Sequence, residues 1–140
     1  MVAQDIMSPL LKVCFPNTTI REAAQLMEEN DCGCLPVMKN YELSSDVIGI
    51  ITDRDVVCRA IALGLDPDDA TVADIMSVPV HAVGLNCPVA DCARILGERG
   101  IRRLAVLDES GTCCGILSQG DIARNATTEE VGAMVKLVSR

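Results

Sequence analysis

The sequence predicts an α/β (α+β) fold made of two copies of one β-α-β-β-α unit. The tetrapeptide Asp-Ile-Met-Ser at residues 5–8 recurs at 74–77, and residues 20–38 align without gaps onto 89–107, both at an offset of 69 positions (74 minus 5). Farther on, Gly-Ile-Ile-Thr-Asp-Arg-Asp at 49–55 matches Gly-Ile-Leu-Ser-Gln-Gly-Asp at 115–121. A repeated order of the same local signals indicates two copies of one structural unit.

The local signals of the first copy agree with this order of elements. A short strand is expected near 12–15, followed by a helix over 20–30. Thr19 and Glu22 have the spacing of a capping box, and Ile20, Ala23 and Met27 lie at helical spacing behind it. Two apolar runs, 34–38 and 47–51, are separated by a polar turn and predict a hairpin, after which a helix over 55–63 is expected.

The second copy predicts the same elements, at 80–83, 89–99, 103–107, 113–117 and 121–125. Thr127 with Glu130 predicts a last amphipathic helix to about residue 138. Between the copies, residues 66–69 predict a turn and helix start with Pro67 in the first helical position, and a further helical turn is expected at 71–74. We therefore expect motif 1 over 1–69 and motif 2 over 70–140, packed pseudo-symmetrically as one compact module.

Composition restricts the class of protein. The 140 residues are 49% hydrophobic, and Phe15 and Tyr41 are the only aromatic residues, which predicts an aliphatic core. The net charge of -8 and the lack of stacking side chains disfavour nucleic acid as a partner. No apolar run is long enough to cross a membrane, and the first residues do not resemble a signal peptide. A cytoplasmic protein with no membrane association is expected.

The eight cysteines admit two interpretations. In a reducing compartment they are small core residues, and their spacings do not match a zinc site, so no metal is expected. The alternative is a thiol-redox or metal-responsive protein that works through its cysteines. His81 is the only histidine, and the sequence contains neither a phosphate-binding Walker loop nor a nucleophile elbow, so we do not expect an enzyme.

The duplicated pattern Gly-h-h-Thr/Ser-x-x-Asp, where h is apolar, also admits two interpretations. Thr52 with Asp55, and Ser118 with Asp121, have the spacing of helix N-caps. The same strand-to-helix junction can instead present an acid to the vicinal hydroxyls of a ribose, and a hydroxyl and free N–H groups to a phosphate. Both interpretations can hold together.

The doubled unit ending in this pattern resembles a tandem pair of CBS domains, the module named after cystathionine β-synthase, over nearly the whole chain. Residues 62–67, Ala-Leu-Gly-Leu-Asp-Pro, are similar to small bacterial stand-alone CBS proteins of the hypoxic-response type. The resemblance implies a regulatory module that binds an adenosine-type nucleotide, such as AMP, ATP or NAD, in crevices between the repeats. It assigns the main site to Thr52, Arg54, Asp55, Val80, His81, Ile101, Arg102 and Arg103, and a second, weaker site to Val13, Cys32, Gly33, Cys34, Ser118, Gly120 and Asp121.

Charge indicates which of the two sites should hold a phosphate. Arg102 and Arg103 stand where the first copy has Gly33 and Cys34, and residues 1–69 carry twelve acids and five bases against eight acids and seven bases in 70–140. Gly120 replaces a hydroxyl that is frequent in the family, which weakens the second site. Alternation along a strand would turn one arginine outward, and His81 can equally be a half-exposed strand residue.

The resemblance also implies a homodimer. The helix after Asp55 carries Val56, Val57, Ile61 and Leu63, an apolar face that one chain of this size would leave partly uncovered. A separate effector protein would receive the signal.

Overall fold

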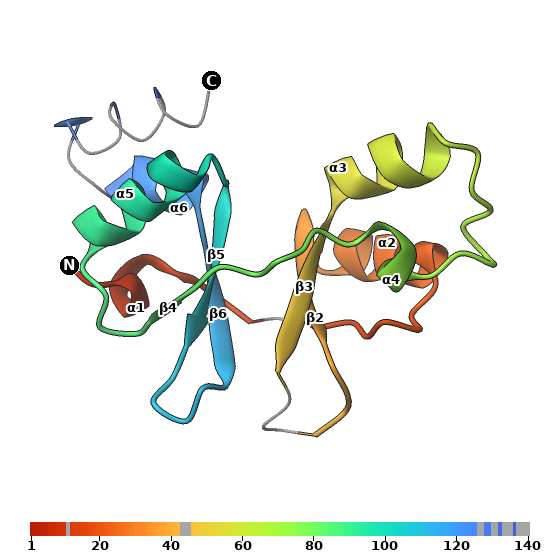
Figure 1. Ribbon diagram of the computed structural model, residues 1–140, viewed down its shortest axis with the longest axis horizontal. Helices are drawn as coiled ribbons and strands as arrows, with labels where there is room; N and C mark the ends of the chain where they lie inside the picture. Colours follow the sequence, from red (N-terminus) through yellow and green to blue (C-terminus); the bar gives the residue numbers. More distant parts are fainter. Residues whose placement is uncertain (11, 43–45, 126–127, 130–131, 133–135, 137–140) are drawn as a thin grey trace. The chain divides into compact units, whose positions relative to one another are not determined.

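The computed structural model describes residues 1–10, 12–42, 46–125, 128–129, 132 and 136. The chain divides into two compact units, one of Leu11–Val80 and one that joins Met1–Leu10 to His81–Arg140. Each unit contains a helix followed by the two strands of a hairpin and a further helical segment, as the repeat predicts (Figure 1). That the motifs 1–69 and 70–140 form one module stays a prediction.

The unit of Leu11–Val80 is built on an antiparallel hairpin of β2 (Cys34–Met38) and β3 (Val47–Thr52). Single bridges extend it on both sides, from Cys14 in parallel to Val37 and from Ser77 in antiparallel to Ile50. Its helical segments are α2 (Ile20–Glu29), α3 (Asp53–Asp55), the π-helix η1 (Val56–Ile61) and α4 (Val72–Ile75).

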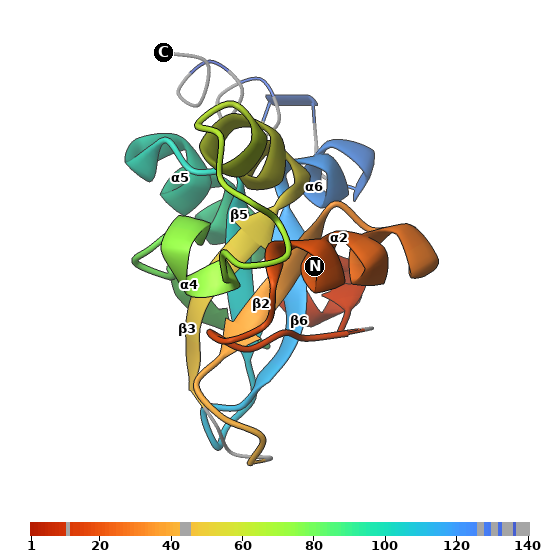
Figure 2. The same cartoon turned by 90° about the vertical axis from the view of Figure 1, so that its right-hand side faces the viewer.

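The second unit has a four-stranded sheet in the order β1-β6-β5-β4. These strands are β1 (Ser8–Pro9), β4 (Ala82–Gly84), β5 (Arg103–Leu107) and β6 (Cys113–Ser118), and β4 is parallel to β5. The helices are α1 (Ala3–Ile6), α5 (Val89–Arg99) and α6 (Gln119–Asn125). The loop that joins β5 to β6 lies at the end of the hairpin away from α5 and α6, which pack on each other (Figure 2).

Each unit has its own aliphatic core, as the composition predicts. In the first unit, Ile20, Leu35 and Ile51 are among the buried residues, and in the second the equivalent positions hold the buried Val89, Leu104 and Leu117. Three or more consecutive residues are buried in each hairpin strand, so both faces of the hairpins are covered. Along α2 and α5 the buried residues recur at helical spacing, so one face of each helix is covered.

Each hairpin contains a glycine at which a neighbouring methionine leaves little room for a side chain. A Cβ built on Gly49 would lie 2.6 Å from the sulfur of Met76, and one built on Gly115 would lie 2.5 Å from the sulfur of Met7. Both methionines belong to the repeated Asp-Ile-Met-Ser segment, which passes over the edge of the hairpin in each unit. A larger residue at either position would therefore displace a methionine side chain, and glycine avoids this close approach.

Most predicted elements are observed, and five expectations need correction or comment. No named strand covers 12–15, where Cys14 alone forms a bridge, and β4 begins two residues later than expected. Residues 66–70 form a turn closed by Ala70 N–H to Asp66 O (2.8 Å), so the helix start at Pro67 is wrong. The segment after Asp55 is a π-helix instead of a regular α-helix. Thr127 and Glu130, from which the last helix is predicted, lie outside the described residues; of that segment only 128–129, 132 and 136 are described, and they are helical.

Candidate functional site

The strand-to-helix junction after β3 is closed by a reciprocal pair of hydrogen bonds. The Thr52 hydroxyl accepts from Asp55 N–H (3.1 Å), and the Asp55 carboxylate accepts from Thr52 N–H (3.0 Å). Thr52 has extended backbone angles and the next residues are helical, which is the geometry of a capping box. The N-cap interpretation of the motif is confirmed here.

The junction after β6 repeats the arrangement. The Ser118 hydroxyl accepts from Asp121 N–H (3.0 Å), and the Asp121 carboxylate accepts from Ser118 N–H (2.8 Å). Two cross-strand pairs also repeat, because Cys34 lies opposite Thr52 and Arg103 lies opposite Ser118. The two junctions are thus the same local structure with different side chains around it.

The carboxylates at these junctions are the buried charges of the described residues. Asp55 is 7% exposed and Asp121 is 3% exposed. A buried carboxylate needs hydrogen-bond donors to compensate for lost hydration. Each receives one from its own cap and one from a serine that the sequence reasoning missed: Ser77 donates to Asp55 (3.2 Å), and Ser8 donates to Asp121 (3.1 Å).

The signal that could have identified these serines is the repeat itself. Ser8 and Ser77 end the two copies of Asp-Ile-Met-Ser, and each lies beside the hairpin of its unit, next to Ile116 and Ile50 respectively. A hydroxyl recurring at equivalent positions with a motif acid indicates a shared contact. In the sequence alone, the tetrapeptide indicates duplication and does not identify its partner.

The two motif aspartates differ in their distance from the nearest arginine that pairs with them. Arg124 Nη2 lies 2.5 Å from an Asp121 oxygen, whereas the closest approach of Arg59 Nε to Asp55 is 3.8 Å. Gly120 fits this contact, because a Cβ there would lie 3.3 Å from Arg124 Nη1. Asp121 is therefore held by a cation of its own unit, and Asp55 has only a distant one.

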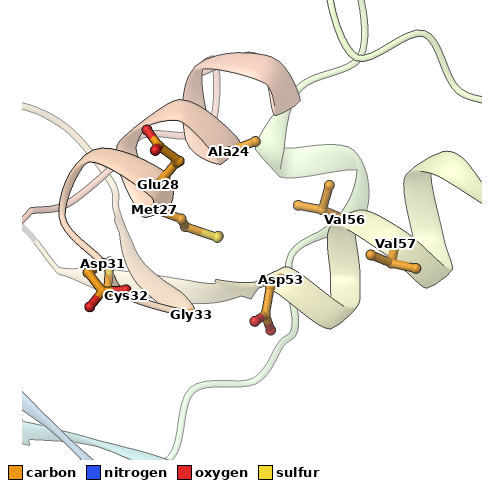
Figure 3. Close-up of a pocket in the computed structure, with 9 residues that line it drawn as sticks. All are labelled: Ala24, Met27, Glu28, Asp31, Cys32, Gly33, Asp53, Val56 and Val57. Atoms are coloured by element: carbon orange, nitrogen blue, oxygen red, sulfur yellow. The ribbon is translucent and has the colours of Figure 1, made fainter.

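An open hollow of about 450 Å³ lies beside the predicted residues Cys32 and Gly33 (Figure 3). Met27 and Val56 point toward each other across it. Three carboxylates and no basic side chain line it, and the lining residues are Ala24, Met27, Glu28, Asp31, Cys32, Gly33, Asp53, Val56 and Val57. An anion would be repelled by these surroundings.

The equivalent positions of the second unit carry the opposite charge. Sequence register replaces the acids Glu28, Asp31 and Asp53 by Gly97, Gly100 and Gln119. It also replaces Gly33 and Cys34 by arginines. Over these five positions the formal charge changes from -3, with three acids, to +2, with Arg102 and Arg103. The second unit is therefore the better partner for a phosphate at this place.

The two arginines differ in exposure. Arg102, the residue before β5, is exposed, and Arg103, the first residue of β5, is half-buried. None of the ion pairs found among the described residues involves Arg54, Arg102 or Arg103. Their charges are not compensated by a carboxylate within 4 Å in that part of the chain.

The remaining residues predicted for the two sites are partly buried. His81 is half-buried, and its carbonyl accepts from Ala105 N–H (3.0 Å); Val80, Val13 and Ile101 are also half-buried. Each predicted site combines residues of one unit with residues of the other, so the grouping into a main and a second site stays a prediction. Within the first unit, Gly33 O accepts from Asp53 N–H (2.9 Å), which brings Gly33 next to the capped junction.

Comparison with known protein families matches the CBS domain twice, at residues 2–60 and 72–127. The chain belongs to the CBS domain family. Hypoxic response protein 1 of Mycobacterium tuberculosis is 31% identical over 136 residues, which cover 97% of this chain and 92% of that protein. The resemblance to a pair of CBS domains, and the α+β fold it implies, are confirmed.

Solved structures of CBS proteins share the fold. The structure of hypoxic response protein 1 with two coordinated zinc ions has a TM-score of 0.74 at 31% identity, covering 91% of this chain and 100% of that one. CBSX2 in complex with AMP has a TM-score of 0.71 at 28% identity, covering 89% and 95%. The hexameric CBS-CP12 protein from bloom-forming cyanobacteria has a TM-score of 0.81 at 30% identity, covering 93% and 74%.

Neither a cluster of metal-ligating side chains nor a membrane-spanning helix is found in the part of the CBS pair that the structure describes. No three side chains of histidine, cysteine, aspartate or glutamate there come together as a metal site. None of the helices described has the length and apolar character to cross a membrane. Burial raises the pKa of the Cys32 thiol, which opposes thiolate formation at the cysteine nearest the acidic hollow.

Proposed function

We propose that this CBS pair is a cytoplasmic regulatory module that binds an adenine nucleotide and catalyses no reaction. The observation that carries the proposal is the buried aspartate at each strand-to-helix junction, oriented by its capping box, in a chain whose second unit also carries two uncompensated arginines. A solved relative of 28% identity was obtained with AMP, which supports an adenosine ligand.

Asp55 and Asp121 are the proposed ribose acceptors. The capping hydrogen bond occupies one acceptor position of each carboxylate. An ionised carboxylate has about four such positions, so it can also accept hydrogen bonds from the vicinal hydroxyls of a ribose. The serine hydroxyl that donates to each acid is a chemical equivalent of a ribose hydroxyl. Binding therefore requires that the ribose share the carboxylate with this serine or replace it.

The phosphate is proposed to bind Arg102 and Arg103, with Arg54 and the Thr52 hydroxyl completing the main site. A guanidinium–phosphate hydrogen bond is charge-assisted and contributes about 1.5 to 3 kcal/mol. The second site, with Asp121, Cys32 and Gly33, would place a phosphate near the acidic hollow. We therefore propose that the main site binds the phosphorylated ligand and the second site binds weakly.

A ligand panel measured by thermal unfolding tests the proposal. AMP, ATP and NAD are each added at increasing concentration, and a ligand that binds the folded state stabilises it by about 2.7 kcal/mol at a hundredfold excess over its dissociation constant. We expect at least one of these nucleotides to raise the unfolding temperature, with adenosine weaker than AMP. A panel with no shift and no heat of binding would contradict the proposal.

Two matched pairs of variants assign the sites. Arg103→Ala should weaken AMP binding roughly tenfold or more, since about 1.4 kcal/mol corresponds to tenfold in affinity. Arg99→Ala, an exposed arginine outside both predicted sites, should leave it unchanged. Asp55→Asn should weaken binding more than Asp121→Asn, and the reverse order would contradict the choice of main site.

The same module is proposed to be a homodimer. Val57, Ile61 and Leu63, on η1 and the turn after it, are 60%, 57% and 72% exposed. Exposed apolar residues gathered on one segment are typical of an interface. The related CBS-CP12 protein is hexameric, which supports self-association of this chain.

A further inference from the structure

Two cysteines occupy a specific pair of positions at the start of α5. Pro88 is the N-cap of this helix, so Cys87 is the residue before the cap and Cys92 is the fourth residue of the helix. Side chains at these two positions pack against each other across the first turn, in the contact known as a hydrophobic staple. Here both members of the staple are thiols.

The contacts of the two residues agree with this placement. The Cys92 thiol donates to the Cys87 carbonyl (3.9 Å), and the Cys87 thiol donates to the Pro88 carbonyl (3.7 Å). Cys92 is fully buried in the core of its unit, and Cys87 packs against the same core while half-exposed. Burial and, secondarily, the interaction with Cys87 raise the pKa of Cys92 to about 12.

The other repeat provides an internal comparison. Thr18 and Ala23 occupy the positions equivalent to Cys87 and Cys92, before the N-cap Thr19 and at the fourth residue of α2. The fold therefore accepts a staple without sulfur at this place. The paired thiols are a property of the second repeat alone.

We propose that Cys87 and Cys92 form a reversible dithiol–disulfide site whose oxidant is a hydroperoxide. The half-exposed Cys87 sulfur attacks the peroxide O–O bond, an S–O bond forms, and the displaced oxygen leaves as an alcohol or water. The Cys92 sulfur then attacks Cys87, the S–S bond forms, the S–O bond breaks, and hydroxide leaves with the Cys92 proton as water. In sum, two thiols and one hydroperoxide give one disulfide, one alcohol or water, and one water.

The division of roles follows from burial. The thiolate is the reacting form, so the oxidant meets the sulfur that solvent reaches, and the buried sulfur acts only after Cys87 has become an electrophile. Of the other cysteines, Cys58 is exposed on η1, and Cys14 is buried with its pKa raised to about 12 by desolvation. Neither of them has a second cysteine at the other position of a helix staple.

The experiment exposes the reduced, full-length protein to hydrogen peroxide, blocks remaining thiols with iodoacetamide, and maps tryptic peptides by mass spectrometry. Cleavage after Arg59 and Arg94 gives a peptide, 60–94, in which Cys87 and Cys92 are the only cysteines. We expect it to lose both alkyl labels, to become lighter by two hydrogens, and to regain the labels after treatment with dithiothreitol. Peptides 22–39 and 104–124, each with two cysteines, should keep theirs.

The matched control is the double variant Cys87→Thr with Cys92→Ala, which copies the staple of the first repeat. It should unfold at a similar temperature and consume less peroxide. Retention of both labels in peptide 60–94 would overturn the proposal, as would earlier label loss in the other peptides. Equal rates of disulfide formation in native and urea-unfolded protein would also overturn it, because the staple would then contribute nothing.

Discussion

The two motif aspartates combine a contact that sequence spacing predicts with one that it does not. The cap between Thr52 and Asp55 spans three residues, so the pattern of side chains along the chain is enough to predict it. The hydroxyl of Ser8 reaches Asp121 over a separation of 113 positions. Such a contact depends on tertiary folding, and a local pattern carries no information about it.

Removal of the serine hydroxyl tests its contribution to the buried acid. Ser77→Ala should lower the free energy of unfolding by about 1.5 kcal/mol, because a hydrogen bond to a charged, buried group is lost and no water replaces it easily. The measurement is urea-induced unfolding followed by circular dichroism.

Ser110→Ala is the matched control, since Ser110 also donates to a carboxylate, that of Asp108, but in an exposed loop. Its effect should be smaller than that of Ser77→Ala because solvent can replace the lost donor. Equal effects of the two variants would show that burial of Asp55 does not strengthen the bond.

At the scale of elements, the helices and strands with strong local sequence patterns are predicted correctly, and those with weak patterns are not. The boundaries of β2 and β5 agree with prediction to the residue, since each contains a run of at least four apolar residues and is followed by a polar turn. The helix α1 has four residues, too few to show helical periodicity, and was not predicted. The π-helix η1 arises from hydrogen bonds such as Ala62 N–H to Val57 O, which differ from those of an α-helix by one residue.

The close approach of the Asp-Ile-Met-Ser segments to the hairpins gives a prediction at this scale. Gly115→Ala should destabilise the protein by about 1 to 3 kcal/mol, because the added Cβ would lie 2.9 Å from the backbone oxygen of Ser8 as well as against Met7. Gly49→Ala should cost less, because its new Cβ meets only the flexible side chain of Met76. Thermal unfolding of both variants measures the difference, and a larger loss for Gly49→Ala would contradict this account.

For the whole molecule, the repeat predicted two equivalent units but not the assignment of their first segments. Ser8, in the first copy of the tetrapeptide, pairs with β6 of the second copy, and Ser77, in the second copy of the tetrapeptide, pairs with β3 of the first. The alignment of the two copies shows which residues are equivalent. It does not show whether each Asp-Ile-Met-Ser segment pairs with the hairpin of its own copy or with that of the other copy. The predicted nucleotide sites draw on both repeats and stay proposals for the same reason.

Self-association is the remaining property of the whole molecule that the structure makes testable. The apolar residues on η1 and the turn after it are exposed in a single chain, and a charge placed among them would have to be buried without a partner if two copies pair there. Ile61→Asp should therefore shift the protein toward the monomer in sedimentation velocity at micromolar concentration. Val78→Asp, at a valine that is 61% exposed but distant in sequence from η1, should leave the association unchanged. If the unmodified protein sediments as a monomer, or if both variants dissociate it equally, the surface formed by Val57, Ile61 and Leu63 is not the interface.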